Sequence, residues 1–185
     1  MAENKFPTEV IDLPSGGRLY PKESPLSSGK IEVKYMTAKE EDILTSQNLI
    51  KKGIVIERLL DTLIVTDGVN VDDLILGDKN AVMVAARVLA YGPEYAVEII
   101  NPTNDEKINY TFNLTDCPFK KLPKNVKLNE FTVDLPVSKS VVKFKLLTGK
   151  EEKLIESDIK SYKKMGTGIS SEITTRLKHS IIEVD

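Results

Sequence analysis

An almost unbroken apolar run at residues 81–91, AVMVAARVLAY, restricts the fold more than any other stretch of this sequence. Arg87 is its only charged residue. A helix that is apolar on all sides is normally buried, and this run is too short to cross a bilayer, which takes about 20 residues. We therefore expect a helix over 78–91 at the centre of a soluble core, capped by Asp78 and stopped by Gly92.

Arg87 needs a partner inside such a helix, because a buried charge is costly unless it is paired and hydrogen-bonded. We expect a carboxylate or backbone carbonyls to hold it, near Asp78 or the segment 12–20. A structural anchor is the favoured role of this arginine, and a ligand site is the alternative.

Two further helices are predicted before this run. The first begins at Thr37, and Glu40 follows at the spacing of a capping box; Gly53 is a plausible stop for this helix. The second is amphipathic, with one apolar face at helical spacing. That face consists of Ile56, Leu59, Leu60, Leu63 and Ile64.

The segment ahead of these helices predicts a flexible arm followed by a hook. Residues 1–9 form the arm, and a short strand over 10–13 is ended by a proline. A glycine turn and an extended return follow, and alternation over 31–35 is typical of a half-buried strand. The residues that mark the hook are Leu13, Pro14, Tyr20 and Pro21.

The rest of the chain predicts two strand pairs and two helices. Alternating apolar residues indicate a hairpin within 94–129, with a polar turn at 101–107 and an irregular loop after it. A second strand pair opens 130–185. Thr148 and Glu151 then repeat the capping-box spacing, Gly166-Thr167-Gly168 breaks that helix, and a last helix runs over about 170–182.

The two halves of the chain resemble each other. The sequence IEVKYMTAKEE at 31–41 returns as VKFKLLTGKEE at 142–152, identical at five of eleven positions, and 58–67 resembles 176–185. Chance likeness is the alternative, because Thr-x-x-Glu is a general capping signal. We expect an α+β fold in which 10–93 form a strand hook and a three-helix unit, with the helical subdomain at about 37–93. Small antiparallel hairpins follow, and the strand–helix–helix unit returns in degenerate form over 130–185.

The repeat also predicts an uncovered surface. The second copy stops at Asp185, before any counterpart of the apolar helix, so its helix pair would lack a cover. Either the natural chain is longer or that face docks onto a partner.

The composition offers little chemistry. The net charge is −2, so no basic footprint for nucleic acid or anionic lipid is present. Cys117 and His179 are the only residues of their types, which rules out a disulfide within the chain and His-rich metal sites. The sequence has no secretory signal and no nucleophile, phosphate-binding or zinc-protease motif. A reducing cytoplasm is the default location, and an enzyme is the least favoured function.

Three motifs, in this order and spacing, resemble the baseplate hub protein family of T-even-like contractile-tailed phages. They are LPSG followed by Tyr20-Pro21, then MTAKEE at 36–41, then GDKN at 77–80 with Arg87 and Tyr91-Gly92 after it. The resemblance covers residues 8–185. The motif residues are Leu13, Pro14, Tyr20, Pro21, Thr37, Glu40, Asp78, Arg87 and Gly92.

The resemblance implies a non-enzymatic structural or assembly component of the baseplate hub, without cofactors. Such a protein would contact other hub or tail proteins, with self-association in a symmetric baseplate as a further option, but no nucleic acid or membrane. It would lie in the virion, or in the host cytoplasm during assembly. A transient chaperone for a hub protein, absent from the mature virion, is the alternative. The expected contact elements are residues 1–30, the turn 101–107 and the last two helices.

The chain departs from some related phage proteins in its hairpin. Those proteins carry a Cys-x-x-Cys there, whereas this turn reads Asn101-Pro102-Thr103-Asn104. A zinc ribbon requires thiolate ligands, so we predict no zinc. The family pattern also runs past the position of Asp185, in agreement with a longer natural chain.

Overall fold

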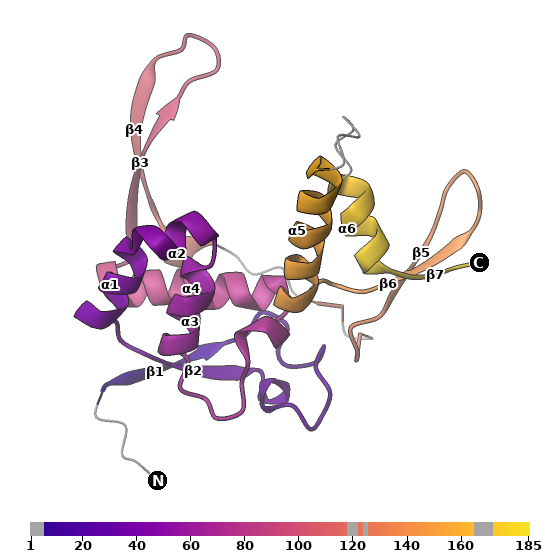
Figure 1. Ribbon diagram of the computed structural model, residues 1–185, viewed down its shortest axis with the longest axis horizontal. Coiled ribbons are helices and arrows are strands. Elements are labelled where there is room, and N and C mark those ends of the chain that lie inside the picture. The colour runs from indigo at the N-terminus through magenta and orange to yellow at the C-terminus, as the bar shows by residue number, and fades with distance from the viewer. Residues whose placement is uncertain (1–5, 118–121, 124–125, 165–171) are drawn as a thin grey trace.

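The computed structural model describes residues 6–117, 122–123, 126–164 and 172–185. The fold is mixed α+β, as predicted, with small antiparallel sheets and short helices. Figure 1 shows the first sheet on one side of the helical body and a long hairpin projecting from the opposite side. No helix within the described ranges is long and apolar enough to cross a membrane.

The first sheet pairs β1 (Thr8–Asp12) antiparallel with β2 (Lys30–Lys34). β1 begins inside the predicted arm, because Thr8 lies opposite Lys34; residues 1–5 of that arm lie outside the described part. The hook connects the two strands and contains the 3-10 helix η1 (Pro25–Ser28). An apolar core lies between this sheet, the hook and the helices.

The segment predicted as one helix after Thr37 forms two, so that prediction was wrong. They are α1 (Ala38–Thr45) and α2 (Gln47–Lys52), separated by Ser46, whose backbone is extended. Gly53 ends α2 in the left-handed conformation, as predicted. The amphipathic helix α3 (Val55–Leu63) buries Leu59, Leu60 and Leu63.

The apolar run forms α4 (Leu76–Tyr91), which follows the 3-10 helix η2 (Val71–Asp73), and Gly92 ends it as predicted. Two expectations were wrong. Asp78 lies within the first turn and is not the cap, because α4 begins earlier. The helix is also not buried on all sides: its buried positions are Asp78, Ala81, Val82 and Ala86. The core covers one face, and Val84, Val88 and Leu89 line an apolar groove on another.

The projecting hairpin consists of β3 (Glu94–Ile100) and β4 (Lys107–Asn113), followed by the 3-10 helix η3 (Leu114–Asp116). The strands are antiparallel, and Val97 lies opposite Tyr110. In Figure 1 the hairpin stands away from the rest of the molecule.

The second unit contains β5 (Phe131–Asp134), β6 (Val141–Phe144), α5 (Gly149–Lys164), α6 (Glu172–Ser180) and β7 (Ile181–Val184). The last helix was predicted to reach residue 182, but Ile181–Val184 instead forms a strand antiparallel to β6. The predicted break at Gly166-Thr167-Gly168 lies outside the described residues, as does part of the predicted loop at 116–129.

The two units share their strand register. Asp12 pairs with Lys30 in the first sheet, and Asp134 pairs with Val141, the position 111 residues after Lys30, in the second. β2 also forms a bridge on its other side, between Val33 and Ile64. The corresponding strand of the second unit, β6, pairs with β7 at the equivalent position, Phe144 with Ile181. The resemblance between the two halves is therefore present in the hydrogen-bonding pattern.

The units contact each other where α4 and α5 begin. The Leu76 amide donates to the Leu147 carbonyl at 3.0 Å, and the Gly149 amide donates to the Leu74 carbonyl at 3.1 Å. A Cβ at Gly149 would lie 3.0 Å from the Cα of Asp72, so this approach favours glycine. Two lysines of α5 form ion pairs with Asp72 and Asp73 of η2.

Candidate functional site

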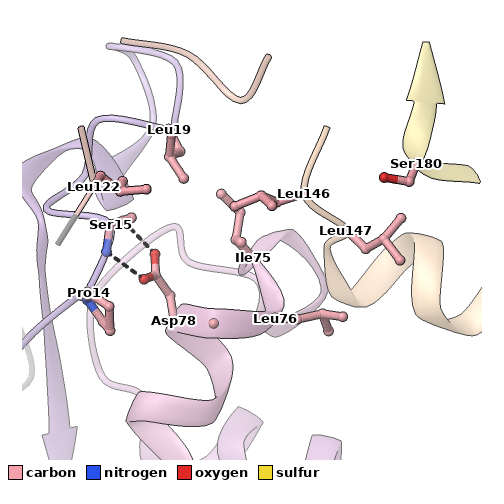
Figure 2. Close-up of a pocket in the computed structure, with 11 residues that line it drawn as sticks. Pro14, Ser15, Leu19, Ile75, Leu76, Asp78, Leu122, Leu146, Leu147 and Ser180 are labelled. Carbon is pink, nitrogen blue, oxygen red and sulfur yellow. Dashed lines mark hydrogen bonds between the residues drawn. The ribbon is translucent and has the colours of Figure 1, made fainter. Parts of the chain in front are cut away.

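The hook is fastened to α4 by the buried carboxylate of Asp78, which is only 1% exposed. The Ser15 amide and hydroxyl donate to Asp78 at 2.9 and 2.6 Å. The Tyr20 hydroxyl donates to the same carboxylate at 2.7 Å and accepts from the Ile75 amide at 3.0 Å. Figure 2 shows Ser15 directed at the Asp78 carboxylate. The first and third sequence motifs thus meet at one point.

Local backbone geometry places Ser15 for this contact. The Gly16 amide donates to the Leu13 carbonyl at 2.8 Å, which closes a tight turn, and the Gly17 amide donates to the Ser15 hydroxyl at 3.1 Å. Gly16 and Gly17 both have positive φ, +59° and +75°, which favours glycine. At Gly17 a Cβ would also lie 2.3 Å from the Ser27 carbonyl oxygen. The hook therefore depends on close packing of its own backbone.

The electrostatics of the cluster favour a fixed structure. Burial, followed by the charge of Asp78 and the hydrogen bond to it, raises the pKa of Tyr20 well above its ordinary value. The phenol therefore stays protonated and remains a donor. The first turn of α4 also favours a carboxylate, because its free amides and the helix dipole attract negative charge. No buried side-chain nitrogen or oxygen among the described residues lacks a hydrogen-bond partner.

An apolar cavity of about 470 Å³ lies beside Asp78, between the two units. Figure 2 shows Leu146, Leu147 and Ser180 of the second unit across it from the hook and α4. Its remaining walls come from Pro14, Leu19, Ile75, Leu76, Gly77 and Leu122. The carboxylate oxygens of Asp78 already accept hydrogen bonds from Ser15 and Tyr20. The cavity surface is therefore mainly apolar and has few polar groups that could orient a reactant.

The predicted capping box at Thr37 and Glu40 is confirmed. Glu40 accepts from the Thr37 amide at 3.0 Å and from Lys34 Nζ at 2.8 Å. Burial alone would raise the pKa of Glu40, but these hydrogen bonds and the Lys34 charge outweigh it and lower the pKa to about 2. The glutamate half of the predicted box at Thr148 and Glu151 is present too, because Glu151 accepts from the Thr148 amide and hydroxyl. Both boxes stabilise helix starts.

Arg87 pairs with a backbone carbonyl, one of the two kinds of partner predicted, but not near Asp78 or the 12–20 segment, so the predicted location was wrong. Its guanidinium donates to the Gly92 carbonyl at 3.1 Å and lies 4.8 and 5.7 Å from the ring centroids of Tyr91 and Tyr95. The side chain is half-buried, so carbonyl and aromatic partners replace the carboxylate that full burial would require. Arg87 thus connects the end of α4 to the first residues of β3.

The motif residues therefore form three separate groups. Leu13, Pro14, Tyr20, Pro21 and Asp78 belong to the hook and its anchor, Thr37 and Glu40 to the start of α1, and Arg87 and Gly92 to the end of α4. Within the described ranges, no group of three or more His, Cys, Asp or Glu side chains could hold a metal ion. His179 contacts Asp158 at 2.9 Å, and Cys117 is exposed.

A uniform apolar surface on the projecting hairpin was not recognised as a site from the sequence. We call it the hairpin face; it consists of Tyr95, Val97, Ile99, Ile108, Tyr110 and Phe112. Its alternation was visible, but the cross-strand register that brings all six side chains to one side was not. The turn at 101–107 that was predicted to make contacts is polar and mostly exposed.

Other predicted contact elements also expose apolar side chains. Leu154 of α5 and Ile173 and Leu177 of α6 are at least half exposed. In the first unit α4 packs against α3, and the described part of the second unit has no helix after α6 in the corresponding place.

The comparisons with known proteins place this structure in a family. The model of the T4 bacteriophage base plate protein family matches residues 7–174 of the 185-residue chain. That range includes the hook, the Asp78 anchor, both capping boxes and the hairpin. No match was found among curated proteins or among solved structures. The chain belongs to the T4 bacteriophage base plate protein family.

Proposed function

We propose that this chain is a non-enzymatic structural or assembly component of the central hub of a phage tail baseplate. It acts through contacts with other hub or tail proteins, in the virion or in the host cytoplasm during assembly. The observation that carries the proposal is the hairpin face, an apolar surface held away from a well-anchored body. Family membership supplies the baseplate context.

The hairpin supports a binding role, because its exposed apolar side chains contribute little to the stability of the isolated chain. A lone two-stranded hairpin is marginally stable in water and normally needs a packing partner. In this chain Tyr95, Ile99, Ile108 and Tyr110 are 40%, 45%, 41% and 54% exposed. Contiguous apolar patches of this kind are typical of protein interaction sites.

The anchored hook supports a structural role. Asp78, Ser15 and Tyr20 join residues distant in the sequence into a fixed contact in which the buried polar groups are hydrogen-bonded. A rigid body of this type can hold the hairpin and the hook in constant positions for a partner, which lowers the entropic cost of binding. The cluster offers hydroxyl donors bound to a carboxylate, without the nucleophile and base pair that acyl transfer needs.

The test is quantitative mass spectrometry of purified mature particles and of isolated hub intermediates. A fixed copy number in mature particles is expected for a structural subunit. Presence in intermediates alone would identify a transient chaperone, the alternative role within the same assembly. Absence from both preparations would overturn the proposal.

A further inference from the structure

We propose that the hairpin face binds the hairpin face of a second copy of this chain, in a two-fold arrangement with the hairpins antiparallel. This inference deepens the proposed function by naming the partner of one surface. It rests on the geometry of β3 and β4, which can be tested on the purified chain.

The strand register gives the hairpin one apolar face and one face that carries its charged residues. Tyr95 lies opposite Phe112, Val97 opposite Tyr110, and Ile99 opposite Ile108, so three consecutive pairs on one face are apolar. The aromatic rings contact each other: Tyr95 and Tyr110 have centroids 5.3 and 6.2 Å from that of Phe112.

The other face carries the charges of the hairpin. Its pairs are Glu94 with Asn113, Ala96 with Thr111, Glu98 with Asn109, and Ile100 with Lys107. Lys107 Nζ also lies 2.7 Å from Glu98. The pleat of the sheet thus places all the charged residues of the two strands, Glu94, Glu98 and Lys107, on this face.

The body of the chain leaves the hairpin face open. The hairpin joins the body near Pro93 and Leu114, whose carbonyl and amide form a 2.9 Å hydrogen bond, and Arg87 contacts only its first ring, Tyr95. Beyond this base it extends away from the other elements in Figure 1. No other described element covers its apolar side chains, four of which are 40% exposed or more.

Charge distribution favours a second copy as the occupant. The hairpin face has no ionisable group near neutral pH to match a charged partner. The acidic side chains Glu94 and Glu98 point to the opposite side, so two hairpin faces can meet without placing like charges together. A surface that is uncharged and uniformly apolar is complementary to itself.

The size gradient along the hairpin favours the antiparallel arrangement. The base carries the aromatic pair Tyr95–Phe112, and the tip carries the smaller pair Ile99–Ile108. Antiparallel packing places each aliphatic tip on the aromatic base of the other copy, and parallel packing would place rings on rings. Alternation of large and small side chains across an interface gives denser packing.

The two-fold axis would then cross the strands at the middle pair, so that Val97 faces Val97 of the second copy. Facing sheets lie about 10 Å apart. A strand of this length spans about 23 Å at about 3.3 Å per residue. Each tip therefore reaches the base of the other hairpin, where Tyr91 is 51% exposed and contacts Arg87.

The expected affinity is modest. Four exposed side chains and two half-buried ones would bury on the order of 400 Å² per copy, about half of the ~800 Å² per partner of a standard interface. Interfaces of this size are typical of weak or transient complexes. We therefore expect a dissociation constant in the micromolar range, so that dimers form at the high local concentration within an assembly.

Sedimentation equilibrium of the full chain, from micromolar to millimolar concentration, tests the association. Val97→Lys should weaken the dimer more than about 100-fold, because two unpaired charges would face each other in an apolar interface. Ala96→Lys is the matched control: it adds the same side chain one residue away on the opposite face, between Glu94 and Glu98, and should leave the dimer unchanged. Circular dichroism should show the same helix content in both variants, because the hairpin lies outside the core.

Thiol cross-linking tests the arrangement. In a Cys117→Ser background, Val97→Cys should be joined into dimers by a short bis-maleimide, and Ala96→Cys should not. A chain that stays monomeric throughout the concentration range would overturn the proposal, as would equal weakening by both lysine variants. A dimer in which Val97→Cys fails to cross-link would overturn the antiparallel arrangement. If Val97→Lys abolishes the dimer and its copy number in baseplates stays normal, a role of the dimer in assembly is refuted, and the proposed hub function stands.

Discussion

Glu40 and Glu151, 111 residues apart, hold the same set of hydrogen bonds. Glu40 accepts from Lys34 Nζ at 2.8 Å and from the Thr37 amide at 3.0 Å, and the corresponding distances at Glu151 are 2.7 and 2.9 Å. These bonds outweigh burial in both cases and lower the pKa of each glutamate to about 2. The two halves therefore share a polar strand–helix joint as well as an apolar pattern.

Glu40→Gln should destabilise the chain most at neutral pH. The folded-state pKa of about 2 lies below the ordinary value of 4.5, so the stabilisation by ionised Glu40 is complete above about pH 4.5 and is lost as the pH falls toward 2. We expect a loss of about 1–3 kcal/mol at pH 7, because the partly buried Lys34 would lose its charged partner. The difference between wild type and variant should narrow at pH 3, measured by urea unfolding.

Glu41→Gln is the matched control for this measurement. Glu41 lies in the same helical turn but is exposed, and its substitution should change the free energy of unfolding by less than about 0.5 kcal/mol. Equal losses for the two variants, or a loss at Glu40 that does not depend on pH, would contradict the assigned role of the Lys34–Glu40 pair.

Tyr20→Phe should weaken the hook without unfolding the body. The change removes a donor from Asp78 and an acceptor from the Ile75 amide, both buried. Leaving buried polar groups unpaired costs about 1–3 kcal/mol. Chemical denaturation should show this loss, and amide exchange should rise over the hook.

Tyr91→Phe removes the same hydroxyl from a ring that is 51% exposed and serves as the control. It should leave both measurements unchanged within about 0.5 kcal/mol. A Tyr20 variant as stable as wild type would show that the Asp78 cluster does not fasten the hook.

Arg87→Leu should loosen the base of the hairpin. Leucine keeps the apolar volume but loses the hydrogen bond to Gly92 and the contacts with the Tyr91 and Tyr95 rings. Each such contact contributes about 0.5–1 kcal/mol at a half-exposed site. We expect faster amide exchange in the first residues of β3 and a decrease of about 1–2 kcal/mol in the free energy of unfolding, mainly from the two ring contacts.

A variant in which exchange rises equally in β2 would show that Arg87 supports the core instead. Arg58→Leu on the exposed side of α3 is a suitable control, because it removes the same charge far from the hairpin. It should leave exchange in β3 unchanged.

Features that depend on a few neighbouring residues could be predicted from the sequence. Both capping boxes have their partners within four residues, and Gly53 and Gly92 end helices by their own backbone geometry. The mixed α+β class follows from the same local patterns. These predictions succeed because the interactions that decide them are short in sequence.

Features decided by distant neighbours could not be predicted. Asp78 was predicted to cap a helix. It anchors the hook instead, because it accepts hydrogen bonds from Tyr20 and Ser15, which precede it by 58 and 63 positions. The apolar residues 181–182 fit the helical spacing of the preceding segment, but they form a strand because they pair with β6. The apolar composition of α4 indicated complete burial, and only the placement of the surrounding elements shows that one side stays open.

Gly17→Ala should be far more damaging than Gly16→Ala, although the two residues are adjacent and both have positive φ. The left-handed conformation penalises alanine at either position, by about 1 kcal/mol. At Gly16 the new Cβ meets no atom within 4 Å, whereas at Gly17 it would lie 2.3 Å from the backbone oxygen of Ser27. Relief of that contact requires the hook to open, and opening would draw Ser15 and Tyr20 away from Asp78.

Thermal unfolding should therefore show a small decrease in Tm for Gly16→Ala and a decrease several times larger for Gly17→Ala. Equal decreases would mean that the close backbone approach within the hook contributes nothing beyond the conformation of the two glycines.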